Sequence, residues 1–451
     1  MPDQASLTAT EPATTRYLEP DSPSARLFER AQHSLPGGNT RLTVHQEPRP
    51  PYAARGHGCF IESVDGDRWL DFFNNATTLV HGHADPDVIQ AVMDTMSRGT
   101  CLSMPTETEI DLAELMTARV ASVEKIRFAN SGSEGVMLAV KAARAFTGRS
   151  KIAKFEGCYH GAHEAVEPNT APPPESWRFE EPQTVSAAEG TPRHILEHTV
   201  VMRYNHIPIM ERLLERHHAD LAAVIVDLMP MRSGLIRAEK AFLERLRALS
   251  AQYGIVLIFD EVISYRVAPG GLQSLVGVTP DLTTFGKIIG GGFPVGACGG
   301  RSDIMAVFDP RGGHPRVPHA GTFNANPVTM IAGATTLRKL TPQVYSRLEQ
   351  LGDMARAGLR DSFAEVGVPV QVTGAGSLFG VLFHNRPIRE YRDLAEKPEE
   401  TKVREAVQTY LKQHGIHMMQ NLIGSVSTPM GSSEIDRLVA TVRDGLRELP
   451  N

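Results

Sequence analysis

Strand-like and helix-like segments alternate along the chain from about residue 125, and this alternation constrains the fold more than any other feature. Residues 125–148 carry a strand pattern, a glycine-containing turn and a helix pattern in succession. LAAVIVDLMP is a short apolar run followed by a helical pattern over 239–252, and YGIVLIFDEV is a second such run. Repeated units of this kind predict an α/β fold built on a mostly parallel sheet.

The 451 residues are more than one simple core usually holds, so we expect separate folded parts. CFIESVDGDRWLDF has the pattern of a hairpin, and GSLFGVLF that of a later strand. Apolar positions have helical spacing over 86–98, 107–120, 343–366, 400–413 and 433–448. We predict a disordered tail over 1–20, a first segment of a smaller domain over 21–75, a large α/β domain over 76–330, and a C-terminal α+β part of the smaller domain over 331–451.

Charge and hydropathy exclude two classes of partner. The formal net charge is -6, with both signs spread along the chain, so we expect no nucleic-acid partner. No apolar run approaches the length of a membrane-spanning helix, and the polar, acidic N-terminal stretch does not resemble a signal peptide. The four cysteines stand far apart without a CxxC pair, which favours the cytoplasm over a disulfide framework. His81 and His83 have a spacing that suits a metal, but no third ligand is evident, so we interpret them as structural.

The segment LIFDEV places a carboxylate, Asp260, directly after four apolar residues. The carboxyl end of a buried parallel strand is where α/β proteins bind ligands. Burying a carboxylate is costly unless it is paired, and a protonated pyridine nitrogen is such a partner. Taken alone, a helix cap or a surface acid after a strand would be the favoured interpretation.

The segment DLTTFGKIIGGGFPVGACGG contains a lysine, Lys287, between small residues and a glycine cluster. Glycines allow the backbone to approach a ligand closely. A lysine must lose its proton before it attacks an aldehyde, and a site of low polarity lowers its pKa. The alternative is a solvated loop lysine, although this loop is unusually apolar for one.

Two further segments of the same α/β region suit a phosphorylated planar cofactor. Ser131, Gly132 and Ser133 follow the strand-like KIRFA and open a helix, where free N–H groups bind anions. A plain N-cap explains these residues equally well. Tyr159 and His160 lie in FEGCYHGAH, where an aromatic ring could stack on a cofactor or simply belong to the core. Each segment is weak evidence, but together with Asp260 and Lys287 they form a consistent set.

The segment FDEVISYRVAPGGLQSLVGVTPDLTTFGKIIGGGFPVGACGGRSDIM resembles the class III, fold-type I aminotransferases that use pyridoxal 5'-phosphate (PLP). It is similar to the glutamate-1-semialdehyde aminomutase branch and closer still to the aromatic β-amino-acid aminotransferases. The resemblance extends from LPGGNTR at 35–41 nearly to the end of the chain. It implies a large domain with a mostly parallel sheet, a smaller α+β domain, and PLP as cofactor.

The resemblance implies a role for each matching residue around the cofactor ring. Lys287 would bind the PLP aldehyde as an imine and then act as general acid and base, and Asp260 would contact the pyridine nitrogen. Tyr159 would stack on the ring with His160 beside it. Val262, two residues after Asp260, would pack on the opposite face.

The phosphate and the subunit partner follow from the same resemblance. Ser131, Gly132 and Ser133 would hold the phosphate. Thr322, in HAGTFNANP, would reach the phosphate of the neighbouring subunit, so the active unit would be a homodimer.

The substrate residues depart from the family pattern. Arg41, in GGNTR, matches a position that binds the substrate carboxylate in the β-amino-acid enzymes, although a surface arginine is the alternative. Those enzymes carry a second arginine near the C-terminus, whose place Asn421 occupies here. Met229, Met231, Met418 and Met419 could line a neutral pocket, with core packing as the alternative for each. Asp227 stands where many members have Glu.

We therefore expect a transaminase that moves an amino group from a β-amino acid, aromatic ones included, or a related amine to a keto acid such as pyruvate or 2-oxoglutarate. A glutamate-1-semialdehyde aminomutase is the second hypothesis, and a racemase or decarboxylase is less favoured. A PLP-binding protein without catalysis is the alternative of another class.

Overall fold

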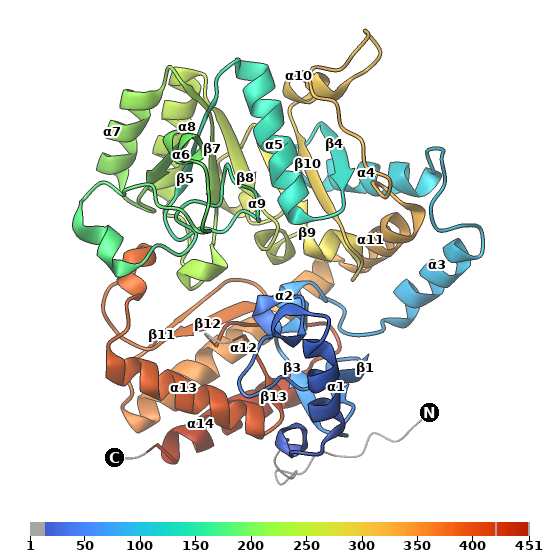
Figure 1. Cartoon of the computed structure of the whole chain (residues 1–451), viewed down its shortest axis with the longest axis vertical. Coiled ribbons are helices and arrows are strands. Elements are labelled where there is room, and N and C mark those ends of the chain that lie inside the picture. The colour runs from blue at the N-terminus through green and yellow to red at the C-terminus, as the bar shows by residue number, and fades with distance from the viewer. Residues whose placement is uncertain (1–13, 420–421, 450–451) are drawn as a thin grey trace.

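The computed structural model describes residues 14–419 and 422–449, which form two lobes (Figure 1). The large lobe is built on a seven-stranded sheet with helices packed against it. The small lobe contains two smaller sheets and three long helices near the C-terminus of the chain. Within the described residues, none of the helices combines the length and the apolar character needed to cross a membrane.

The seven-stranded sheet has the order β4-β10-β9-β8-β7-β5-β6. Its strands are β4 (Lys125–Ala129), β5 (Lys151–Phe155), β6 (Thr199–Met202), β7 (Leu221–Asp227), β8 (Val256–Asp260), β9 (Leu282–Gly286) and β10 (Gly296–Gly300). Only β10 runs against its neighbours β4 and β9 in this described sheet, so the prediction of a mostly parallel α/β sheet is confirmed. The central strands are buried along their whole length because their apolar runs face helices on both sides.

The helices of the large lobe include the four predicted over 86–98, 107–120, the second part of 125–148, and 239–252. They are α3 (Pro86–Met96), α4 (Glu107–Arg119), α5 (Gly132–Thr147), α6 (Arg193–Glu197), α7 (Ile207–His217), α8 (Lys240–Tyr253), α9 (Gln273–Val276), α10 (Ser302–Met305) and α11 (Pro327–Lys339). α5 lies across the sheet in Figure 1 and ends at Gly148, whose φ of 71° is the left-handed conformation that favours glycine.

The small lobe combines segments from both ends of the chain. Its first sheet has the order β1-β2-β3-β13, and its second β11-β12-β14. The strands are β1 (Ala53–His57), β2 (Phe60–Ser63), β3 (Arg68–Asp71), β11 (Gln371–Thr373), β12 (Leu378–Leu382), β13 (Ile416–His417) and β14 (Gly424–Ser425). The helices are α1 (Pro23–Gln32), the short α2 (Asn74–Thr77), α12 (Pro342–Val366), α13 (Pro398–Gln413) and α14 (Ser432–Arg447). β2 and β3 form the predicted hairpin.

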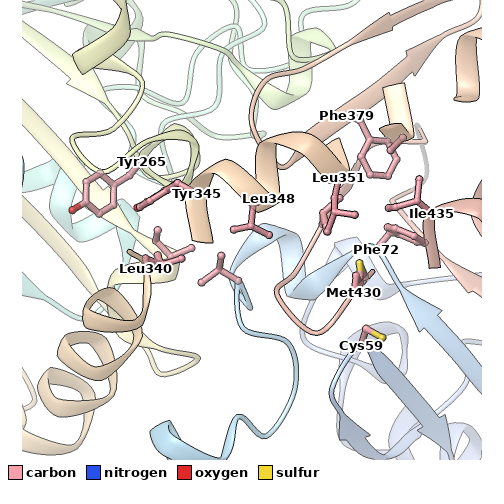
Figure 2. Close-up of a cluster of buried hydrophobic side chains, with 14 of the residues drawn as sticks. Cys59, Phe72, Tyr265, Leu340, Tyr345, Leu348, Leu351, Phe379, Met430 and Ile435 are labelled. Atoms are coloured by element: carbon pink, nitrogen blue, oxygen red, sulfur yellow. The ribbon is translucent and has the colours of Figure 1, made fainter. Parts of the chain in front are cut away.

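One hydrophobic cluster continues from the large lobe into the small lobe along α12 (Figure 2). Tyr265 and Leu340 lie at its large-lobe end, and Phe379 and Ile435 lie at the other. α12 has apolar residues at helical spacing, and its buried face contributes Leu348 among others. The two lobes therefore share a packed core rather than a thin interface.

Two expected boundaries differ from the structure. The tail expected over 1–20 is too long, because Thr14 N donates to Gln413 O at 2.8 Å and Tyr17 is buried against Trp69 with ring centroids 6.2 Å apart. The boundary expected between 330 and 331 falls inside α11, a helix that packs on α3 and α4 of the large lobe. We propose the start of α12 as the boundary instead.

Candidate active site

The residues singled out in the sequence converge at one edge of the seven-stranded sheet. β4, β5, β7, β8 and β9 are parallel, so their carboxyl ends meet at the same edge. This edge faces the small lobe (Figure 1). Arg266, just after β8, reaches across to it: Nη1 donates to Thr77 O at 2.5 Å and Nη2 to Val426 O at 2.6 Å. The site therefore lies between the lobes.

Asp260, the last residue of β8, is 5% exposed and fully engaged by hydrogen bonds. His160 Nδ1 lies 2.7 Å from Asp260 Oδ2. Val262 N and Thr284 Oγ1 each donate to Oδ1 at 3.1 Å. The structure thus brings three predicted residues together and adds Thr284, which sequence reasoning missed. The signal for it was the pair of threonines, Thr283 and Thr284, between the apolar residues of β9.

His160 is almost completely buried, and its second ring nitrogen, Nε2, is buried without a hydrogen-bond partner among the described residues. Burial lowers the pKa of His160, while its hydrogen bond to Asp260 opposes that shift. A neutral imidazole that donates from Nδ1 orients the Asp260 carboxylate.

Asp227 lies beside Asp260 on the neighbouring strand, in direct register across the parallel β7–β8 pair. Its Oδ1 accepts from Met229 N at 2.9 Å. Burial, and next the charge of Asp260, raise the pKa of Asp227 well above its usual value, which favours the neutral acid at this position. The pair can thus be buried with one negative charge instead of two.

Lys287 follows Gly286, the last residue of β9, and its backbone is strained. Its φ is 52°, a left-handed conformation that is uncommon for a residue with a side chain. Burial lowers the pKa of Lys287 to about 8; the Asp260 carboxylate opposes the shift, and the charge of Arg41 adds to it. The amine is therefore much closer to its nucleophilic, neutral form at physiological pH than an ordinary lysine.

This shift predicts how the apoprotein takes up its aldehyde cofactor. The rate of PLP attachment to Lys287 should rise with pH with a midpoint near 8, rather than near the ordinary 10.5, because only the neutral amine attacks. Stopped-flow absorbance between pH 6 and 10 measures this rate, with a free amine as reference for the ionisation of PLP itself. A midpoint that coincides with that of the free amine would contradict the prediction.

Two glycines after Lys287, Gly291 and Gly296, pack against backbone rather than facing a ligand, whereas Gly292 lines a cavity. A Cβ at Gly296 would lie 1.7 Å from Ser131 O, and one at Gly291 would lie 2.4 Å from Ala332 O. These glycines let the backbone after Lys287 pack against the start of α5 and against α11.

The start of α5 combines both interpretations of its sequence. The Ser131 side chain is an N-cap, accepting from Glu134 N at 3.2 Å. The first N–H groups of a helix have no intrahelical acceptor, so those of Gly132 and Ser133 remain for an anion. A Cβ on Gly132 would lie only 3.2 Å from both methyl groups of Val262, and one on Gly161 would lie 2.5 Å from Ser133 Oγ. These glycines hold three segments close together around the helix N-terminus.

Two predicted residues have exposed side chains. Tyr159 is 48% exposed, with the Arg232 guanidinium 5.6 Å from its ring centroid. Its accessible face suits the expected stacking role, which stays a prediction. Thr322 is exposed, and its carbonyl lies 3.4 Å from Cys101 Sγ. Its expected contact with a second subunit likewise stays a prediction.

A buried lysine, Lys154 on β5, holds the loop that carries Tyr159 and His160. Its Nζ donates to three carbonyls, at 2.9 Å to Cys158 and at 2.6 Å each to Val166 and Pro168. Although burial lowers the pKa of Lys154 to about 7, three acceptors use all the hydrogens of an ammonium group, so we favour the charged form. Sequence reasoning missed this residue, because KIAKF reads only as a short strand.

The backbone opposite the site has an unusual left-handed turn. Residues 74–77 all have positive φ, between 46° and 71°, although none is glycine. Arg266 Nη1 binds the carbonyl of Thr77, and the Asn74 side chain donates to Ser425 O at 2.7 Å. Such strain persists only where neighbouring contacts fix it, and it clusters at functional sites. The contacts of Arg266 thus suit a structural role.

A cavity of about 550 Å³ lies beside this turn, on the face of the β1–β2–β3 sheet that points away from the small-lobe core. Arg41 lines it from an exposed loop, and Met418 and Met419 line it from the segment after β13. Met229, by contrast, is completely buried in the core. Asn421, expected to replace an arginine near this position, lies outside the described residues.

The two histidines with metal-like spacing have other partners. His81 Nδ1 lies 3.0 Å from Thr428 Oγ1 and Nε2 lies 3.0 Å from Thr336 O. His83 Nε2 lies 2.7 Å from Asp71 Oδ2. These contacts suit structural roles.

The edge of this mostly parallel sheet carries a buried aspartate, a lysine with a lowered pKa and the N-terminus of a helix. This combination is the one expected of fold-type I PLP enzymes. The class III aminotransferase family model matches residues 43–424. The chain is 43% identical over 373 residues to a glutamate-1-semialdehyde 2,1-aminomutase from Methanothermobacter thermautotrophicus, covering 82% of this chain and 86% of the relative.

Two solved structures are similar over nearly the whole chain. An omega-transaminase from Sphaerobacter thermophilus is 52% identical with a TM-score of 0.93, over 96% of this chain and 99% of that one. A beta-phenylalanine aminotransferase from Variovorax paradoxus is 36% identical with a TM-score of 0.85, over 96% and 95%. The chain belongs to the class III aminotransferases, and its cofactor is PLP.

The residues present fit this cofactor. The helix N-terminus suits a phosphate, the Asp260 carboxylate suits a protonated ring nitrogen, and the depressed pKa of Lys287, lowered by burial, suits attack on an aldehyde. The unpartnered His160 Nε2 marks a buried polar atom at the same place.

Proposed function

We propose that this transaminase moves the amino group of a β-amino acid, with aromatic ones favoured, or of a related amine to a keto acid. The observation that carries the proposal is the Arg41 guanidinium, which has no carboxylate partner among the described residues. It lines the cavity of about 550 Å³, and its charge helps to lower the pKa of Lys287. The same cavity has the aromatic residues Tyr52, Trp69 and Phe73, which suit the ring of an aromatic substrate. A relative named beta-phenylalanine aminotransferase supports this substrate class.

The proposed roles of the chain's residues follow from their positions. Bound PLP supplies an aldehyde carbon that receives the amine and a ring that takes up an electron pair. Lys287 would hold the cofactor through its amine and, when that amine is free, would move the proton at the amine-bearing carbon. Asp260, held by His160, keeps the ring nitrogen protonated. Gly132 and Ser133 hold the phosphate through their N–H groups.

We propose a homodimer as the active unit. Thr322 is exposed next to Phe323, which is 60% exposed. Large apolar side chains of α3 and the loop after it are also exposed, including Met93, Met104 and Leu102. Exposed apolar groups in such numbers suit a subunit interface better than solvent.

The four cysteines are free, which suits the cytoplasm as the site of action.

The second candidate is a glutamate-1-semialdehyde aminomutase, favoured by the name of the relative that is 43% identical. It differs from the first candidate in the substrate that converts the cofactor. Half-reactions on PLP-loaded protein separate the two, with β-phenylalanine, 1-phenylethylamine and glutamate-1-semialdehyde added separately while the cofactor absorbance is followed.

The first candidate predicts that β-phenylalanine bleaches the absorbance of the bound PLP. Arg41→Met should raise the KM for β-phenylalanine by roughly 10- to 100-fold because a charge-assisted contact with the substrate carboxylate is lost. The same variant should leave the KM for 1-phenylethylamine nearly unchanged, because this amine has no carboxylate. Arg30→Met, at an exposed arginine of α1, is the matched control. Conversion by the semialdehyde alone would sink the transaminase proposal in favour of the aminomutase.

A further inference from the structure

The cavity that Arg41 lines has a second cation, Lys412, near the end of α13. Arg41 and Lys412 both line it, whereas no Asp or Glu is among its lining residues. Within residues 14–419 and 422–449, neither cation forms an ion pair with a carboxylate. Two cations that line one cavity without a carboxylate suit an anionic ligand.

Both the backbone carbonyl and the side chain of Lys412 are fixed by contacts with neighbouring residues. Its carbonyl accepts from Trp69 Nε1 at 3.0 Å and from Thr14 Oγ1 at 2.5 Å. Its Nζ donates to Gln46 Oε1 and lies 4.6 Å from the centroid of the Tyr17 ring. The ammonium group has three hydrogens, and these two neighbours leave one free for the cavity.

The environment of Lys412 disfavours an unpaired charge. Burial lowers the pKa of Lys412 to about 8, with no carboxylate to oppose the shift. A partly desolvated ammonium gains most from a carboxylate, through a charge-assisted hydrogen bond. The amide oxygen of Gln46 and the ring of Tyr17 stabilise the ammonium charge less than a carboxylate would, so the cavity suits an anion.

The charges of the two cations act on different groups. The pKa of Lys287 is lowered by burial and, among charges, by Arg41. The pKa of His417 is lowered chiefly by burial, with Lys412 among the contributing charges. Because the charge of Arg41 acts on Lys287 while Lys412 packs on the Tyr17 ring in the small lobe, we assign Arg41 to the side of the reacting amine and Lys412 to the far end of the cavity.

We propose that Lys412 binds the remote carboxylate of a dicarboxylic keto acid, the amino acceptor, while Arg41 binds the carboxylate next to the keto group. The inference rests on the proposed transaminase function. A transaminase binds donor and acceptor in turn at one site, so the aromatic wall serves the ring of the donor and Lys412 serves the second charge of the acceptor. A monocarboxylic acceptor such as pyruvate leaves Lys412 unpaired.

The test compares 2-oxoglutarate with pyruvate. Holoenzyme is first converted to its amine-loaded form with the donor, and the return of the PLP spectrum is followed after each keto acid is added. Lys412→Met should lower kcat/KM for 2-oxoglutarate roughly 10-fold or more and leave that for pyruvate unchanged, because only the dicarboxylate loses a charge-assisted contact. Lys412→Arg should retain most of the preference. Lys402→Met, at an exposed lysine of the same helix, is the matched control.

A binding measurement separates this inference from the proposed function. Trp69 lines the cavity and donates to the Lys412 carbonyl, so its fluorescence should report glutarate added to the PLP-loaded protein. Glutarate binding that Lys412→Met weakens supports the site even if no amine donor converts the cofactor. Equal losses for both keto acids, glutarate binding that is indifferent to Lys412, or equally tight binding of inorganic phosphate would each overturn it.

Discussion

Lys287→Ala should abolish multiple turnover, lowering kcat by roughly 10³-fold or more, because the variant lacks both the covalent anchor and the group that moves the proton. The fold should be retained, since the side chain removed is a desolvated amine that forms no hydrogen bond within the described part of the chain, and its loss removes a burial cost. Alanine and lysine both carry a Cβ, so the positive φ at residue 287 costs about the same in the variant as in the wild type.

Two readouts separate loss of chemistry from loss of structure. Borohydride treatment of PLP-loaded protein followed by intact mass should add the cofactor mass to the wild-type chain and not to Lys287→Ala. Circular dichroism and thermal unfolding should remain close to the wild type. Lys240→Ala, at an exposed lysine of α8, is the control and should behave as wild type in every assay. Normal turnover by Lys287→Ala would remove this residue from its proposed role.

Asp260→Asn should lower kcat by roughly 10²- to 10³-fold, because a neutral amide cannot stabilise a protonated ring nitrogen as a carboxylate does. The amide oxygen can still accept from Val262 N and Thr284 Oγ1, whose bonds both go to one oxygen of the carboxylate. The amide nitrogen would then face His160 Nδ1, and the imidazole can accept by moving its proton to Nε2, which has no partner among the described residues. The variant should therefore fold and bind PLP.

A single-turnover half-reaction with the best amine donor checks this expectation, because it isolates the chemical step from binding of the acceptor. The loss should appear in the rate and much less in the donor concentration that gives half the maximal rate. Asp220→Asn, an exposed aspartate at the opposite end of β7, is the matched control. A wild-type rate in Asp260→Asn would mean that another group stabilises the ring nitrogen.

The position of Asp260 could be predicted because it follows an apolar run typical of a buried strand, whereas Lys287 was singled out by the glycine-rich segment around it. VLIFD and LTTFG are fully buried in the sheet, and a parallel sheet brings strand ends together. Local patterns likewise predicted the hairpin at β2 and β3 and the helices α3, α4 and α12, since periodicity reports which face of an element is buried.

Other expectations failed where a local pattern had two physical meanings. The glycines after Lys287 indicated a ligand, but Gly291 and Gly296 instead allow backbone to pack against backbone. The polar N-terminal stretch indicated a tail to residue 20, but Tyr17 is buried against Trp69. In both cases the deciding partner is distant in the sequence, so no local pattern could reveal it.

The sequence by itself determined the α/β class, the strand ends that carry Asp260 and Lys287, and, through resemblance, the family. Only the tertiary structure decided the burial, the hydrogen-bond partners and hence the pKa shifts of the residues at this site. The bond between His160 and Asp260 joins residues 100 positions apart, and the register of β7 on β8 sets Asp227 against Asp260. The cavity that holds Lys412 exists only where both ends of the chain meet. Burial and pairing of charges depend on such long-range contacts, whereas strands and helices are specified largely by their own residues.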